Sequence, residues 1–508
     1  MMILKTSRSN LSSNDQLSLD LPFAATKSLA ARVGPTPTFT RGSGATYIGS
    51  DGLIHGVDTS TTSNTIGTGS RTFTLAATAG QDQFWRTGDA VEASNGSNSM
   101  VGTVTGYNAA TQVLVCNMTS TGGSGTFTAW RIGYRGPRFD HTSAGVCRGL
   151  LIEEGRTNLL QHSSNFKDTT SSSYWQNMTA TTVTVDQTTS PDGGVNADLL
   201  TTSATAFDCF TRRSGVYAAA STQYTYSIFV KRGPSNYRYV GFYVGAGTGG
   251  TAQFPYFDFD NPTIVQLPTI TYGTINSTRV DPYPNGWYRI SITFTTGATT
   301  PSTFAGVFIS SSTGAAQSTN PAGNDCYIWG IQSELGSFPT SYIPTTTGTL
   351  ARSADVCNIT GDDFSGFYNQ SEGTLTVKVE EFRRGTSYNT VVEIFNGLSY
   401  SGNRLGVVFG GLRSGVTSPL EISLFSGGPA QYQTATTSTS SGYTAAIAYA
   451  TDNVRGSLNG NLLAADTPPS NVNIGANTIR FGSIGIHIAA VRFYKKRLPN
   501  AKLQALTV

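Results

Sequence analysis

Alternating apolar and polar residues along most of the chain predict β-strands. In residues 224–231 (YTYSIFVK), every second side chain is large and apolar, which gives an extended strand one face suited to burial. In residues 237–244 (YRYVGFYV), Tyr237, Tyr239 and Tyr243 share one face, and two valines and a phenylalanine share the other. Similar stretches recur at roughly even spacing between Gly, Pro and Asn residues. The pattern predicts an all-β, multidomain protein with antiparallel β-sandwiches.

Breaks in the alternation divide the chain into segments. The predicted order is an N-terminal arm (1–56), a small inserted β domain (57–133), a connecting segment (134–157), a first sandwich (158–350), a linker (351–370) and a second sandwich (371–508). The arm contains one short apolar stretch, residues 17–30, which buries little by itself. We therefore expect the arm to pack on another subunit or on a larger particle. Asn459–Gly460 is the strongest short hairpin signal, and Pro499 predicts a last helical turn.

Composition narrows the class of protein. Only 12% of the 508 residues are charged, whereas Gly reaches 57 residues, and Tyr and Phe reach 23 and 26. A hydrophobic fraction of 38% is enough for real cores, so the chain is not of the disordered class. Uncharged polar faces of this kind suit secreted or particle-bound proteins. The net charge of +3 is small and dispersed, which argues against a nucleic-acid-binding surface.

The cysteines and the N-terminus indicate where such a chain folds. The five cysteines are widely spaced and form neither a CxxC pair nor a Cys/His cluster, so a zinc site is not expected. We expect small buried thiols and assembly in a reducing cytoplasm. The N-terminal apolar run is too short for a signal peptide, and no stretch approaches 18 apolar residues, so membrane insertion is not expected.

Three phrases of the sequence carry a resemblance to a known family. Residues 149–160 (GLLIEEGRTNLL) closely resemble a segment common in structural proteins of tailed bacteriophages, especially tail-fibre and head-fibre-like proteins. Residues 38–54 (TFTRGSGATYIGSDGLI) and 332–345 (QSELGSFPTSYIPT) resemble two further phrases of that family. The three phrases stand in the expected order. The resemblance implies a virion component, without indicating which one.

Both sandwiches also resemble known binding domains. Residues 285–294 (NGWYRISITF) and 325–335 (DCYIWGIQSEL) resemble carbohydrate-binding modules of the jelly-roll type. That resemblance implies a sugar-binding concave face and often a structural calcium ion. The strand order of residues 371–508 resembles concanavalin A-like (laminin-G-like) lectin domains, although the calcium-ligand pattern of that family is not evident here.

Aromatic side chains are the candidate glycan contacts, because a pyranose ring presents C–H groups to a π face and an apolar wall excludes water. The candidates are Tyr237, Tyr239, Tyr243 and Trp329, with Arg238 or Gln332 as polar partners. The alternative is that these rings fill a sandwich core. Asn158 and Asp325 are the calcium candidates, with a turn role as the alternative for the aspartate.

Catalysis is the minority interpretation. Asp258 and Asp260 share one strand face, so they could act on one glycosidic bond, but Asn261–Pro262 follows and marks a loop. The sequence contains no GxSxG elbow, HExxH motif or phosphate-binding loop, and no repeat typical of a β-helix. We therefore expect no catalytic residues.

The resemblance and the uncharged aromatic faces together predict a non-enzymatic phage adhesin, carried on a tail or head fibre and assembled in the host cytoplasm. The expected partners are other virion proteins, held by the N-terminal arm, and a host-surface polysaccharide. A homotrimer is expected from the family resemblance and from the slender Gly/Thr-rich region. Two alternatives stay open: a capsid or collar decoration fibre with a purely structural role, and a polysaccharide depolymerase.

Overall fold

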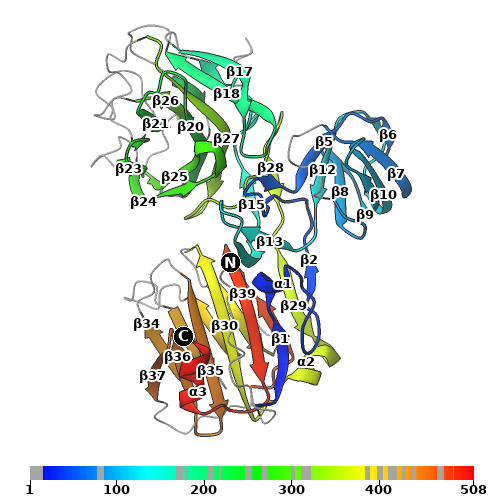
Figure 1. The fold of residues 1–508 in the computed structure, drawn as a ribbon, viewed down its shortest axis with the longest axis vertical. Helices are drawn as coiled ribbons and strands as arrows, with labels where there is room; N and C mark the ends of the chain where they lie inside the picture. The colour runs from blue at the N-terminus through cyan, green and yellow to red at the C-terminus, as the bar shows by residue number, and fades with distance from the viewer. Residues whose placement is uncertain are drawn as a thin grey trace, which may run out of the picture.

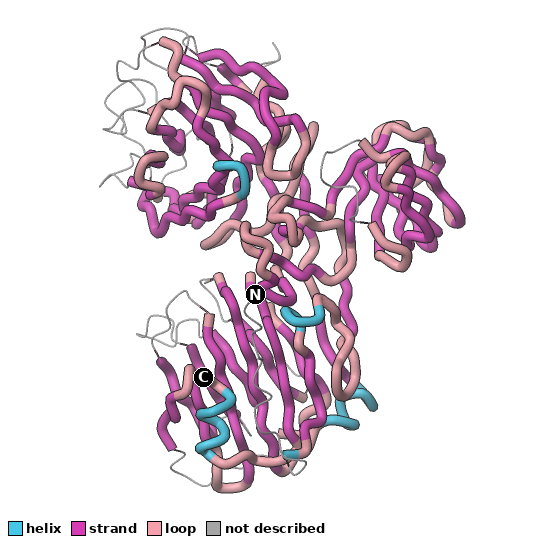
Figure 2. The backbone as a smooth tube through the Cα atoms, viewed as in Figure 1, coloured by secondary structure: helices cyan, strands magenta, loops and turns pink. Residues whose placement is uncertain are grey.

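Antiparallel sheets build three lobes around a central joint in the computed structural model (Figure 1). The all-β fold predicted from the alternation is confirmed: strands dominate every lobe, and the few helices are short (Figure 2). The structure describes residues 15–76, 85–167, 175–177, 181–202, 210–214, 216, 219–245, 255–265, 273–298, 304–310, 322–383, 389–396, 404–409, 420–425, 430–436, 442–465, 474–483 and 485–508.

The first lobe is a small barrel-like sheet. Its six strands have the order β5 (Val57–Ser60), β12 (Trp130–Tyr134), β8 (Ala90–Asn95), β9 (Asn98–Asn108), β10 (Val113–Gly122) and β7 (Gly69–Thr74). A bridge between Ser60 and Leu75 brings the two edge strands together. β6 (Asn64–Thr65) and β11 (Thr126–Phe127) pair beside it. Phe73, Leu114 and Ile132 are fully buried inside the lobe.

The second lobe, here called the middle sandwich, packs two six-stranded sheets face to face. One has the order β16 (Gln176–Asn177), β19 (Phe210–Ser214), β26 (Phe304–Ile309), β21 (Tyr239–Gly245), β22 (Tyr256–Asp258) and β23 (Thr263–Val265). The other has the order β17 (Thr181–Thr189), β18 (Val195–Thr202), β27 (Asp325–Leu335), β20 (Gln223–Arg232), β25 (Trp287–Thr296) and β24 (Gly273–Pro282). A short 3-10 turn, Pro284–Gly286, leads into β25.

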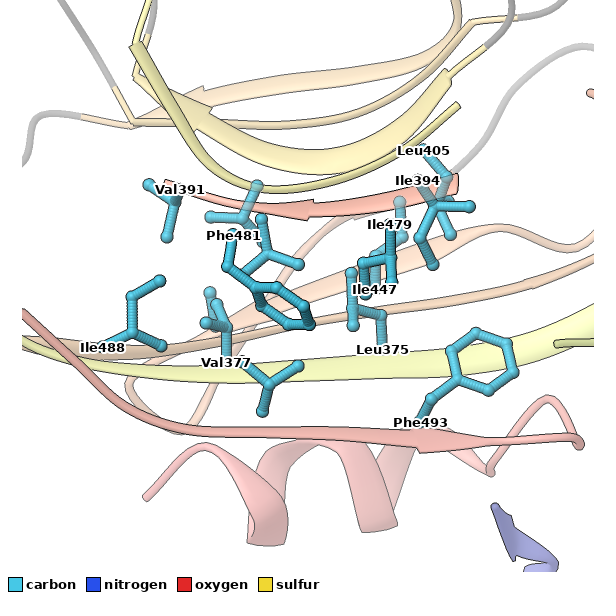
Figure 3. Close-up of a cluster of buried hydrophobic side chains, with 14 of the residues drawn as sticks. Leu375, Val377, Val391, Ile394, Leu405, Ile447, Ile479, Phe481, Ile488 and Phe493 are labelled. Atoms are coloured by element: carbon cyan, nitrogen blue, oxygen red, sulfur yellow. The ribbon is translucent and has the colours of Figure 1, made fainter. Parts of the chain in front are cut away.

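The third lobe, the C-terminal sandwich, is the largest. Its first sheet has the order β13 (Arg138–His141), β14 (Cys147–Ile152), β39 (Ile486–Tyr494), β30 (Glu372–Phe382), β35 (Tyr443–Ala450), β36 (Arg455–Leu458) and β37 (Asn461–Ala465), with β1 (Leu17–Leu21) also on β39. Its second sheet has the order β2 (Thr38–Thr40), β29 (Val356–Thr360), β38 (Thr478–Phe481), β31 (Asn389–Phe395), β32 (Arg404–Phe409), β33 (Leu420–Phe425) and β34 (Ala430–Thr436). Leu375, Ile479 and Phe493 meet in the core between them (Figure 3).

Two local predictions at this lobe are confirmed. Asn459 and Gly460 both have positive φ, 45° and 77°, as a tight hairpin turn between β36 and β37 requires. Pro499 precedes α3 (Asn500–Leu506), the predicted last helical turn. The remaining helices, α1 (Phe23–Thr26) and α2 (Gly361–Phe367), also belong to this lobe.

The N-terminal segment differs from the expected arm. β1 pairs antiparallel with β39 from Leu17–Tyr494 to Leu21–Val491, and β2 pairs with β29. Leu19 and Leu21 are fully buried in the C-terminal core. The segment therefore completes the C-terminal sandwich of its own chain. Its partner strand, β39, lies near the other end of the sequence. Residues 1–14 of the expected arm lie outside the described residues.

A buried cluster of opposite charges holds the joint together. Arg138 donates to Glu153 (2.8 Å), to Asp355 (2.5 Å) and to the Ser341 hydroxyl (2.9 Å). Arg41 donates to the other carboxylate oxygen of Asp355 at 2.9 Å. The side chains of Arg41, Arg138 and Asp355 have no exposed surface. Such a cluster is stable only when every charge is paired, which fixes the arrangement of the segments that supply it.

Three of the five side chains in this cluster come from the phrases on which the family resemblance rests, whereas Arg138 and Asp355 lie outside those phrases. Arg41, Glu153 and Ser341 each come from a different phrase. The short strands β15 (Arg156–Asn158) and β28 (Leu350–Arg352) pair in the same region (Figure 1). The short strands β3 (Tyr47–Ile48) and β4 (Ile54–His55) also pair, and β3 contacts β13. The three phrases therefore meet at the joint between the lobes, together with the segments around Arg138 and Asp355.

Three of the four cysteines within the described residues are buried, as expected for small apolar thiols. Cys116, Cys326 and Cys357 are buried, Cys147 is half-buried, and all four are free thiols. Burial raises the pKa of Cys116 to about 12, so this thiol stays protonated and unreactive at neutral pH. Cys209 lies outside the described residues.

Candidate binding face

The candidate site lies on the outer face of strands β21 and β22 in the middle sandwich. Val240, Phe242 and Val244 point into the core and are buried, as the alternation predicts. The residues between them face the other way. Tyr239 is paired with Asp258 across the two strands, so an aromatic ring and a carboxylate share the outer face.

Two tyrosines remain accessible at this face. The Tyr237 and Tyr239 side chains are half-buried, with ring centroids 6.3 Å apart and planes at 83°. Tyr239 also meets the buried ring of Tyr256 edge-on, at 5.4 Å and 89°. Edge-to-face contacts of this kind hold the rings in fixed orientations. The Tyr237 hydroxyl donates to the Ser310 carbonyl at 3.0 Å, which anchors its end of the row.

Arg238 forms a two-pronged ion pair at the centre of the face. Its Nε and Nη2 atoms each lie 2.7 Å from a different oxygen of Asp258. The guanidinium also lies 5.1 Å from the centroid of the Tyr239 ring. The hydrogen bond from Arg238 lowers the pKa of Asp258, and the reciprocal bond raises the pKa of Arg238. Both groups are therefore charged at neutral pH.

A second ion pair adjoins the first. Arg232 donates to Asp260 at 2.5 Å, and its guanidinium lies 5.5 Å from the centroid of the Phe259 ring. Asp260 also lies 3.2 Å from the Nε atom of Arg238, so the two pairs form one network. We call this group the binding face: Arg232, Tyr237, Arg238, Tyr239, Asp258 and Asp260. Arg232 was not a candidate from the sequence, because no local pattern shows that it meets Asp260, which lies 28 positions further along the chain.

Three of the predicted glycan contacts are sealed inside the protein. Tyr243 is 4% exposed, Trp329 is 1% exposed, and Gln332 is fully buried. Trp329 packs against Phe229 at 5.3 Å and Tyr342 at 4.6 Å. These three side chains therefore cannot touch a glycan in this structure.

The burial of Trp329 has a specific cause. It lies on the outer face of its sheet, where alternation alone predicts exposure, but the segment around Tyr342 crosses that face and covers it. Gln332 binds the same segment, because its side-chain oxygen accepts from the Ile343 N–H at 2.6 Å. The face predicted to bind sugar on this sheet is occupied by the chain itself.

The two predicted calcium ligands do not meet. The side-chain nitrogen of Asn158 donates to the Ile331 carbonyl at 3.2 Å, and its oxygen accepts from the Ser333 N–H at 3.1 Å. Asp325 accepts from the N–H and hydroxyl of Ser235, at 3.0 and 2.7 Å. On β27, Asp325 lies six to eight positions from the residues that Asn158 binds, Ile331 and Ser333. That separation is roughly 20–25 Å along a strand. Both side chains hold neighbouring segments in place by hydrogen bonds, and their oxygens accept from protein donors.

The Asp258 and Asp260 pair does not have the properties of a hydrolytic pair. A glycosidase needs one carboxyl group that holds a proton at working pH. Asp258 is held ionised by Arg238, and its pKa is lowered below its usual value. Both carboxylates are engaged by arginines, which suits binding better than proton transfer.

A scan against models of known protein families matches none, and no curated protein matches the chain. Among the described residues, none of the helices has the length and apolar character needed to cross a membrane. Within the same ranges, no group of three or more His, Cys, Asp or Glu side chains is arranged to hold a metal ion.

Proposed function

We propose that this chain is a non-enzymatic fibre-like protein of a tailed-bacteriophage virion, and that it attaches to a host-surface glycan through the binding face. The observation that carries the proposal is the accessible Tyr237–Arg238–Tyr239 row beside two carboxylates. Aromatic walls with a few placed polar groups are the usual composition of a sugar site. The virion assignment rests on the three family-like phrases.

The face favours weak contact with each glycan. One side of the Tyr239 ring is already covered by Arg238, so a sugar would meet ring edges and ion-pair groups rather than a wide open platform. Weak sites become effective when several copies act together, because multivalency raises overall affinity by about 10²–10⁴ without new contacts. We therefore propose a homotrimer as the working form, held to the virion by other structural proteins. Light scattering of the purified chain tests this, and a monomer at micromolar concentration would contradict it.

Replacing Tyr239 with alanine tests the site. We expect Tyr239→Ala to lower binding to host-surface polysaccharide about fivefold to tenfold, because an aromatic contact contributes about 1 kcal/mol or slightly more. Binding is measured on immobilised polysaccharide, and function is measured by how well the purified protein blocks phage adsorption. Tyr107→Ala is the matched control, since Tyr107 is a half-buried tyrosine in another lobe. Equal binding by wild type and Tyr239→Ala would contradict the proposed site.

A capsid or collar decoration fibre is the second candidate function. The observation that favours it is that half of the predicted glycan contacts, including Trp329, are buried. Electron microscopy of labelled virions separates the two, because a capsid position supports decoration and a tail position supports attachment. Release of oligosaccharide from host glycan by the wild-type chain, lost in Asp258→Ala, would favour a depolymerase over both.

A further inference from the structure

Every charge on the binding face is already paired within the chain. Asp258 takes two hydrogen bonds from Arg238, each 2.7 Å long. Asp260 is bound by Arg232 at 2.5 Å and lies 3.2 Å from Arg238. Two arginines face two aspartates, so the face carries no net charge. An anionic ligand would meet arginines whose charge is already neutralised and would lie beside the two carboxylates, which costs Coulomb energy.

The polar atoms of the binding face that the ion pairs do not use are suited to bind uncharged hydroxyl groups. Within the described ranges, the Nη1 atom of Arg238 and the hydroxyl of Tyr239 make no hydrogen bond. The carboxylate of Asp260 is 49% exposed, so its remaining lone pairs are open to solvent. The face thus offers an N–H donor, a hydroxyl and a carboxylate acceptor side by side. A sugar hydroxyl both donates and accepts, so neighbouring hydroxyls can bind this mixed set without a net charge on either partner.

We infer that the binding face selects neutral glycans over acidic ones, which rests on the proposed function and specifies its substrate class. The ligand is a chain of uncharged, hydroxyl-rich sugars, and uronate- or sialate-containing chains bind less well. Binding should also depend weakly on salt, because no charge–charge contact forms with the ligand.

The experiment uses the full chain on a panel of immobilised neutral and acidic bacterial polysaccharides, at low and at physiological ionic strength. The expected result is binding to neutral members, at least about fivefold tighter than to acidic members, with little change between the two salt conditions. Tighter binding to acidic members, lost as salt rises, would overturn the inference and leave glycan attachment standing. Absence of binding to every member of the panel would overturn both.

A variant that is expected to gain binding complements this test, because a misfolded protein could lose binding but would not gain it. Asp260→Asn leaves the face with one surplus positive charge, and Asp260 is exposed enough to be replaced without loss of core contacts. We expect this variant to bind acidic polysaccharide about fivefold more tightly at low salt, the effect of roughly one new charge contact near water. Asp452→Asn, the same change at an exposed turn of the C-terminal sandwich, is the control and should show no gain. If Asp260→Asn and Asp452→Asn behave alike, charge balance at the face does not set the selectivity.

Discussion

Buried charged residues contribute to stability according to how completely they are paired. At the joint, burial alone would raise the pKa of Asp355, but the guanidiniums of Arg138 and Arg41 lower it below its usual value. Burial would likewise raise the pKa of Glu153, and Arg352 and Arg138 lower it strongly. The cluster therefore stabilises the fold at neutral pH and loses this contribution only as pH falls through these lowered pKa values.

Removing the central cation of the joint should be severe. Arg138→Met leaves Glu153 and Asp355 buried with fewer partners, so we expect a loss of about 3–5 kcal/mol in the free energy of unfolding. Arg32→Met is the matched control, because Arg32 is 58% exposed and pairs with Asp20 at 3.2 Å. That surface pair should contribute less than about 1 kcal/mol. Denaturant unfolding measures both, and comparable losses would contradict the role assigned to the joint.

Asp58 should show the opposite dependence on pH. It is 9% exposed and accepts a hydrogen bond from Trp85 at 2.8 Å, and burial raises its pKa to about 6. Because the unfolded chain ionises near pH 4, stability falls as pH rises from about 4 to about 6 and then stays constant. Asp58→Asn removes this effect and keeps an acceptor for Trp85.

The expected result is a variant more stable than wild type by up to about 3 kcal/mol at pH 7, and nearly equal to it at pH 4. Unfolding by urea at the two pH values measures the difference. Asp452→Asn, at an exposed turn, is the control and should stay within about 0.5 kcal/mol of wild type at both. A variant that is less stable than wild type at pH 7 would contradict the assignment.

At the scale of elements, β1 and the first lobe (the small barrel-like sheet, here called the barrel lobe) differ in how far the rest of the fold depends on them. β1 supplies Leu19 and Leu21 to the C-terminal core, so it is integral to a lobe formed mainly by distant residues. The barrel lobe enters and leaves the joint at neighbouring points, since the Tyr134 N–H donates to the Gly56 carbonyl at 2.7 Å. β1 is therefore short but required for the C-terminal sandwich to fold, whereas the barrel lobe is large but can be removed without disturbing the two sandwiches.

Two deletions test this contrast. Removal of residues 1–34 takes Leu19, Leu21 and Phe23 out of the core, where each truncation costs about 2–5 kcal/mol. The sum rivals the whole stability of a typical domain, so we expect an unfolded or insoluble C-terminal sandwich. Replacement of residues 57–133 by two glycines should leave both sandwiches folded. Limited proteolysis and near-ultraviolet circular dichroism measure the outcome, and a folded 1–34 deletion would contradict the assignment of β1.

The alternation along the chain was sufficient to predict strands and their buried faces, as Val240, Phe242 and Val244 show. It was not sufficient to predict which outer faces stay open, because that depends on segments far away in sequence. Trp329 is covered by the segment around Tyr342, a contact that no local pattern encodes. The same holds for β1, whose partner strand lies at the other end of the chain.

At the scale of the whole molecule, charged contacts fix two lobes against each other. Arg279 on β24 of the middle sandwich donates to Glu381 on β30 of the C-terminal sandwich at 2.5 Å. Glu381 also receives Arg148, and Arg383 donates to the Pro339 carbonyl across the same boundary. Burial would raise the pKa of Glu381, but Arg383 and His487 lead the groups that lower it, so it stays ionised. The binding face is therefore presented on a lobe with a set orientation.

Reversing one charge at this boundary should separate the lobes. Arg279→Glu places like charges against Glu381 and Asp281, at a cost of the order of 1–4 kcal/mol. We expect a longer maximum dimension by small-angle X-ray scattering, with the content of β-structure unchanged. Lys378→Glu, at an exposed position of β30, is the control. An unaltered scattering curve for Arg279→Glu would show that other contacts hold the orientation.

The pairing of β1 with β39 sets an order of events during synthesis. Leu17 and Tyr494 are partners although they lie about 480 positions apart in the sequence. A ribosome adding roughly 5–20 residues per second needs roughly 25–95 seconds to produce the second strand after the first has emerged. The nascent chain must keep Leu19 and Leu21 from aggregating throughout that delay, while the barrel lobe and the middle sandwich can already close. β1 is thus synthesised long before its partner strand is available to pair with it.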